Sequence, residues 1–172
     1  MDDAMNNKVN YESEILFGYM NTPSYGCFGE DDGGFSIDIY PDGKLIYKTY
    51  IFDMIEKTKR ELKLDFESIE NIVTVLSTYE KDIATFDEHI DNGSCDGNGN
   101  FFIFNGKRII TWNIEYFDED EIKKLNPKYY EEYLPMIKQQ NLMIEIFARV
   151  SEILKKQGIN LRIYEVNFNE ND

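Results

Sequence analysis

Two hairpin signals constrain the fold of this chain more than any other feature of its sequence. Apolar and polar residues alternate on both sides of Pro41-Asp42-Gly43, and two further apolar runs flank Asn105-Gly106. Proline presets φ in a turn and glycine accepts positive φ, so both motifs favour a tight reversal between neighbouring strands. Strands joined by tight reversals run antiparallel. The sequence therefore predicts a sheet that is mainly antiparallel.

Two long stretches carry the helical period instead. Apolar residues recur every three or four positions from 66 to 86 and from 130 to 154, which is typical of a helix with one buried side. Asp65 is placed to cap the first helix, which we expect to end near His89. Gly158 is placed to end the second, and Pro135 is expected either to kink that helix or to begin its main body. A short helical piece is expected to open at Asp118–Glu121.

The strands predicted from alternation complete the architecture. They span residues 11–20, 35–40, 45–51, 58–64, 101–104, 107–116 and 159–168. This order predicts an α+β fold with a mainly antiparallel sheet of about five to seven strands and two principal helices packed on one face. A chain of 172 residues has the length of one ordinary domain. We therefore expect a single domain over 1–172, with flexible ends at 1–10 and 169–172.

The charge of the chain is strongly negative. It has 33 acidic and 18 basic residues, a formal net charge of −15. Nucleic acid and anionic membrane surfaces both select for positive charge, so neither is expected as a partner. Residues 1–43 and 64–100 each hold nine acidic residues and one basic residue, whereas residues 44–63 hold three acidic and six basic. The two acidic stretches also contain the two glycine-rich loops, so we expect a concentrated negative surface if those loops lie together.

The remaining composition predicts a soluble, cytoplasmic protein. No run of 18 apolar residues is present, and the first residues are acidic and polar, unlike a signal peptide. Cys27 and Cys95 are the only cysteines, which is too few for a disulfide framework and fits a reducing compartment. No oligomeric state follows from these features.

The two glycine-rich loops supply the candidate binding residues. The first contains Glu30–Asp32 and the second is Asp91–Asn100, although turn-forming residues are also what a plain connection needs. The second loop offers oxygen ligands, but position 12 of an EF-hand register falls on Lys107 or Ile103 in place of Glu, so no metal or cofactor is predicted. We predict that both loops, with Tyr129 of the second helix, contact a partner. The predicted contact residues are Glu30, Asp31, Asp32, Asp91, Asn92, Ser94, Asp96, Asn98 and Tyr129.

Three other residues invite a chemical interpretation. His89 is the only histidine and Cys95 lies six positions later, so a small hydrolase would use one of them or a carboxylate pair. No spacing selects such a group, and no catalytic residue is predicted. Trp112 alternates in step with Ile110 and Ile114, which predicts a place in the core, with an exposed interface anchor as the alternative.

The charge and the loops together favour a binding function. We expect a non-enzymatic, acidic binding or inhibitory protein that acts on a basic protein, because charge complementarity speeds encounter and buried aromatic side chains hold a complex. In size and acidity the chain is similar to bacterial immunity proteins that neutralise basic toxins such as nucleases. Two alternatives remain open. One is a small hydrolase using carboxylates, His89 or Cys95, and the other is a small-ligand or cation-binding module using loop 91–100.

Overall fold

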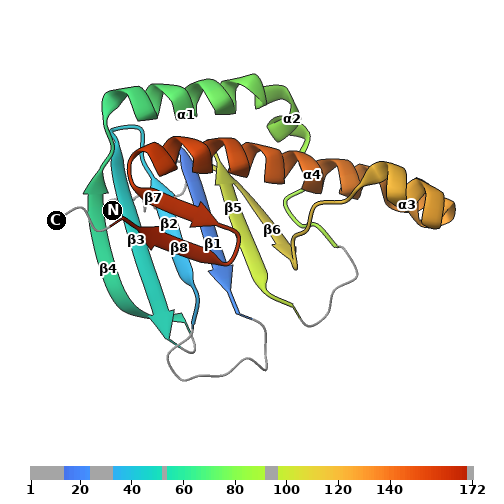
Figure 1. The fold of residues 1–172 in the computed structure, drawn as a ribbon, viewed down its shortest axis with the longest axis horizontal. Coiled ribbons are helices and arrows are strands. Elements are labelled where there is room, and N and C mark those ends of the chain that lie inside the picture. Colours follow the sequence, from blue (N-terminus) through green and yellow to red (C-terminus); the bar gives the residue numbers. More distant parts are fainter. Residues whose placement is uncertain (1–13, 24–32, 52–53, 92–96, 170–172) are drawn as a thin grey trace, which may run out of the picture.

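One antiparallel sheet of six strands forms the centre of the molecule (Figure 1). The computed structural model describes residues 14–23, 33–51, 54–91 and 97–169. The strand order is β4-β3-β2-β1-β5-β6, and neighbouring strands are antiparallel throughout. The strands are β1 (Phe17–Thr22), β2 (Phe35–Ile39), β3 (Lys44–Ile51), β4 (Ile55–Lys63), β5 (Gly99–Phe104) and β6 (Lys107–Trp112).

The helices lie on one face of this sheet, together with a separate two-stranded hairpin (Figure 1). The helices are α1 (Phe66–Thr78), α2 (Glu80–Thr85), α3 (Glu119–Leu125) and α4 (Pro127–Lys156). The hairpin consists of β7 (Ile159–Arg162) and β8 (Glu165–Phe168). These elements confirm the predicted α+β fold with a mainly antiparallel sheet. None of the helices in the described part of the chain is long and apolar enough to cross a membrane.

The core forms between the sheet and α4. Phe17, Tyr19 and Phe102 point from the central strands toward the helices and are almost fully buried. Their rings lie 4.9–6.2 Å from the ring of Phe147 on α4, within the range of favourable aromatic contacts. We call this side of the sheet the inner face.

The first predicted helix is broken where the sequence shows a continuous period. α1 ends at Thr78, and α2 restarts at Glu80 after Tyr79, whose ring remains buried. The predicted end near His89 is therefore wrong. His89 instead forms an isolated parallel bridge with Ile110 at the edge of β6. The Ile90 N–H donates to the carbonyl of Ile110, and the Ile110 N–H donates to the carbonyl of Glu88, so the backbone here pairs with β6 and not within a helix.

The end of the chain also differs from the prediction. Residues 159–168 form the β7–β8 hairpin and not one strand, with Arg162 paired to Glu165 across a two-residue turn. That turn contains Tyr164 at φ +76°, a left-handed conformation that usually takes glycine. Because Ile163 and Tyr164 are typical strand residues, the turn had no sequence signal. α4 begins at Pro127 and runs through Pro135, so Pro135 does not begin the helix.

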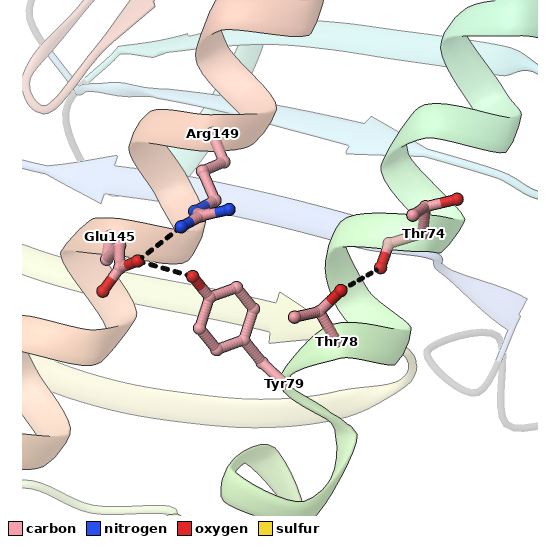
Figure 2. A network of polar contacts seen from close by, with 5 residues as sticks. All are labelled: Thr74, Thr78, Tyr79, Glu145 and Arg149. Carbon is pink, nitrogen blue, oxygen red and sulfur yellow. Dashed lines mark hydrogen bonds and ion pairs between the residues drawn. The ribbon is translucent and has the colours of Figure 1, made fainter.

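A polar contact fixes α1 and α4 to one another (Figure 2). The Tyr79 hydroxyl donates to Oε1 of Glu145 at 2.5 Å, and the Arg149 guanidinium donates to the same oxygen at 2.9 Å. The guanidinium also lies over the Tyr79 ring, 5.3 Å from its centroid. These hydrogen bonds, first that of Tyr79 and then that of Arg149, lower the pKa of Glu145. The contact thus joins the end of α1 to the middle of α4.

The prediction of a core position for Trp112 is wrong. Trp112 is 40% exposed and shares the outer face of the sheet with Ile110, while Ile114 is buried after the strand has ended. Apolar and polar residues do alternate along β6, but Ile110 and Trp112 lie on the face of the sheet that is turned away from the helices.

Candidate functional site

Three connections leave the sheet at the same end. β1 ends where β5 begins, with Thr22 paired to Gly99, and β2 begins one position away, with Phe35 paired to Asn21. β3 ends and β4 begins at the pair Ile51 and Ile55. The described residues that bracket segments 24–32, 52–53 and 92–96 therefore lie side by side at this end (Figure 1). We call it the loop end of the sheet.

Glycines let the backbone approach closely at the loop end. Gly34 has φ +87°, and a Cβ atom there would lie 2.0 Å from the carbonyl oxygen of Asn21. A Cβ atom on Gly97 would lie 2.1 Å from Nδ2 of Asn113. The first contact is with a backbone atom and Gly34 has a positive φ, so position 34 requires glycine, whereas at position 97 the neighbour is the end of a side chain. Gly34 thus has a structural cause at the point where the first loop joins the sheet.

A buried amide cluster ties the first strand to the start of the fifth. The Tyr19 hydroxyl donates to Oδ1 of Asn100 at 2.8 Å, and Nδ2 of Asn100 donates to the carbonyl of Asn98 at 3.0 Å. Nδ2 of Asn21 donates to the carbonyl of Gly99 at 3.4 Å. Asn100 is fully buried and Asn21 is 6% exposed. Burial raises the pKa of Tyr19, so its hydroxyl stays protonated and acts as a donor.

A hollow of about 540 Å³ opens beside this cluster, between the inner face of the sheet at the loop end and the turn of the β7–β8 hairpin. The described residues around it carry aromatic rings, amides and hydroxyls, and none of them carries a carboxylate. Lys57 is their one charged residue. The lining residues are Asn21, Pro23, Gly34, Phe35, Tyr47, Thr49, Tyr50, Lys57, Thr58, Asn98 and Tyr164.

Tyr164 closes one side of the hollow and is held by hydrogen bonds to two other segments. Its backbone N–H donates to the Tyr19 hydroxyl at 3.4 Å, and its own hydroxyl donates to the carbonyl of Ile114 at 3.3 Å. These bonds join the hairpin turn to β1 and to the chain after β6. A positive φ is unfavourable for a bulky residue and persists only where surrounding contacts outweigh its cost. These two hydrogen bonds supply such contacts for Tyr164.

The predicted contact residues divide into three groups. Six of them lie outside the described residues: Glu30, Asp31, Asp32, Asn92, Ser94 and Asp96. Asp91 is exposed, and Asn98 is half-buried at the edge of the hollow. Tyr129 lies elsewhere, in the first turn of α4, where its ring stacks on Tyr133 at 4.5 Å. The structure thus brings Asn98 to the loop end and places Tyr129 away from it.

The residues considered for catalysis are not gathered in a described pocket. His89 is exposed, and Cys95 lies outside the described residues. Within the described ranges, no group of three or more His, Cys, Asp and Glu side chains is arranged to hold a metal ion.

Several residues of the loop end are not predicted as buried, and Asn100, expected in loop 91–100, belongs to β5. Asn21 and Asn100 continue the inward alternation of Tyr19 and Phe102, so each is a polar residue at a position that points into the core. That mismatch between residue type and strand face is a readable signal, because buried amides need partners. No comparable signal marks Thr58 or Tyr164, which reach the hollow only through the pairing of β4 and the hairpin turn.

The chain has no match among known protein families or among curated proteins.

Proposed function

We propose that this protein is a non-enzymatic, acidic binding protein that inhibits a basic protein partner, in the manner of an immunity protein. The loop end of the sheet is the proposed contact surface. The observation that carries the proposal is the pairing of Thr22 with Gly99, which makes the two glycine-rich connections neighbours.

The distribution of charge supports this assignment. The connection between β1 and β2 contains Glu30, Asp31 and Asp32, and the connection into β5 contains Asp91 and Asp96. Five carboxylates thus belong to two connections whose ends are adjacent in the sheet. A local concentration of negative charge attracts a basic surface over several ångströms and raises the rate of encounter.

A capture experiment with matched variants tests the proposal. The loop variant carries Glu30→Gln, Asp31→Asn, Asp32→Asn, Asp91→Asn and Asp96→Asn. The control variant neutralises five exposed carboxylates on the helices, with Glu67→Gln, Glu70→Gln, Glu80→Gln, Glu131→Gln and Glu132→Gln. Both changes raise the net charge by the same amount, so they separate local from overall charge.

The expected result is a basic protein captured from native lysate by the parent and by the control variant, and lost by the loop variant. Mass spectrometry identifies it and gives its isoelectric point. If all three baits capture the same protein, or if both variants lose it equally, the loop end is not the contact surface. A captured partner that is acidic or neutral would contradict the electrostatic basis of the proposal.

A further inference from the structure

We propose that the hollow at the loop end binds a small neutral ring that carries several hydroxyl groups, either a pyranose sugar or the ribose of a nucleoside. This site lies at the same end of the sheet as the acidic protein contact proposed above, but neither proposal depends on the other. The inference combines the size of the hollow, the residue types around it and the buried cluster that fixes its shape.

The size and the rings suit a compact cyclic ligand. Small-molecule sites commonly enclose about 300–1,000 Å³, and this hollow measures about 540 Å³. The rings of Phe35, Tyr47 and Tyr164 line it, and those of Phe35 and Tyr47 lie 6.2 Å apart, whereas Tyr50 turns its ring to the outer face, where its hydroxyl is hydrogen-bonded to Ser36. Aromatic side chains offer flat apolar surface, which packs against the C–H face of a sugar or against a nucleobase.

The polar groups suit hydroxyls. Oγ1 of Thr49 and Oγ1 of Thr58 are hydrogen-bonded to each other, 2.5 Å apart, across the β3–β4 pair. Two hydroxyls that share one hydrogen bond still have one proton and several lone pairs free, so they can both donate to and accept from a ligand. Asn21 and Asn98 add amide groups on the opposite side of the hollow. This mixture of donors and acceptors matches the mixed character of a ligand hydroxyl.

The described lining of the hollow is largely uncharged. Lys57 is its one charged residue, and Lys57 already interacts with another group of the protein. A neutral ligand therefore leaves no charge unpaired against these residues.

The hollow is held in shape before any ligand arrives. Asn21 is fixed by the buried cluster with Asn100, and Tyr164 is fixed by Tyr19 and the carbonyl of Ile114. A site whose walls are already ordered binds with less loss of conformational freedom.

Titration followed by ¹H–¹⁵N NMR tests the inference. The probes are D-glucose and N-acetyl-D-glucosamine in one arm and uridine and adenosine in the other, because the arms distinguish a pyranose from a ribose. We expect one arm to shift the backbone amides of Asn21, Thr49, Thr58, Asn98 and Tyr164 in a saturable way. If neither arm shifts these amides, or if the shifts fall elsewhere, the inference is wrong.

A double variant tests the role of the hydroxyls. Thr49→Val with Thr58→Val removes both partners of one hydrogen bond and keeps their shape, which is nearly neutral for folding. It should weaken binding at least about fivefold, the ratio expected for one lost hydrogen bond. The control, Thr74→Val with Thr78→Val, alters two hydroxyls of α1 that donate to carbonyls of their own helix and should bind as the parent does (Figure 2).

The single variant Thr58→Val lies on an exposed edge strand and replaces the double variant if that one fails to fold. Unchanged affinity in the hydroxyl variant, or an equal loss in the α1 control, would overturn the assignment of this hollow.

Discussion

Gly34 holds β1, β2 and β3 together at the loop end. The Gly33 N–H donates to the carbonyl of Tyr50, and the Tyr50 N–H donates to the carbonyl of Gly34. These two hydrogen bonds extend the β2–β3 pairing beyond the first residue of β2. At the same time the Gly34 backbone lies against the Asn21 carbonyl of β1. The end of the first acidic connection is thus fixed to the sheet on both sides.

Gly34→Ala should destabilise the protein by about 2 kcal/mol or more, because it adds a steric clash to an unfavourable positive φ. Gly158→Ala is the matched control. It has a similar φ of +76°, but its added Cβ would meet no atom closer than 3.4 Å, so it should lose only about 1 kcal/mol. Urea unfolding measures both free energies. Equal losses in the free energy of unfolding would show that the backbone at position 34 can move away from the Asn21 carbonyl.

The Tyr79–Glu145 hydrogen bond should make stability depend on pH. Hydrogen bonds lower the pKa of Glu145 in the folded state, so the ionised carboxylate favours folding. Its contribution is present above the unfolded pKa, about 4.3, and is lost as pH falls through the lower folded value. Glu145→Gln should therefore be less stable than the parent at pH 7, by about 0.5 kcal/mol for this half-exposed pair, and equally stable in acid.

Glu152→Gln, on the same helix, is the control for this pH comparison. Its carboxylate lies 3.9 Å from Lys155 and is well exposed, so the substitution should change little at either pH. A difference between Glu145→Gln and the parent that does not shrink in acid would show that the charge of Glu145 contributes nothing.

At the scale of elements, the hairpins and helices were predictable because their signals are local. Asn105-Gly106 connects β5 to β6 with φ values of +49° and +81°, as a tight hairpin requires. Asp65 caps α1 through a 2.7 Å bond from the Ser68 N–H, as its position before the apolar period indicated. Such signals need no knowledge of the rest of the chain.

The misread elements depend on contacts from distant segments. The bridge between His89 and Ile110 ends the helical region early, and the turn at Tyr164 is stabilised by groups on β1 and after β6. Trp112 was assigned to the wrong face because alternation divides residues into two sets without saying which set faces the helices. The same limit applies to the hollow, whose residues come from six separate segments of the chain.

Pro135 gives a test at this scale. It lies in the ninth position of α4, is exposed, and removes a backbone N–H that would donate to the carbonyl of Glu131. Pro135→Ala should therefore stabilise the protein by about 1–3 kcal/mol. Glu132→Ala, also exposed on α4, should stay within about 0.5 kcal/mol of the parent. A loss of thermal stability in Pro135→Ala would show that the proline sets a bend that the packing of α3 on α4 needs.

At the scale of the whole molecule, the topology decides how the negative charge is presented. The chain departs from the central strand β1, builds β2–β4 on one side, and returns through α1 and α2 to place β5 on the other side. This path brings the connections of two separate acidic stretches, residues 1–43 and 64–100, to the same end of the sheet. The basic stretch 44–63 forms β3 and β4 at one side.

We propose that the carboxylates of the two loop-end connections steer a basic partner onto the protein. The most direct test of this steering is the association rate with the captured partner at low and high ionic strength, for the parent, the loop variant and the helix control. Added salt should slow association of the parent and of the control by about tenfold or more, because salt screens the attraction. The loop variant should start slower and respond much less to salt. A loop variant with the same salt dependence as the parent would contradict the claim.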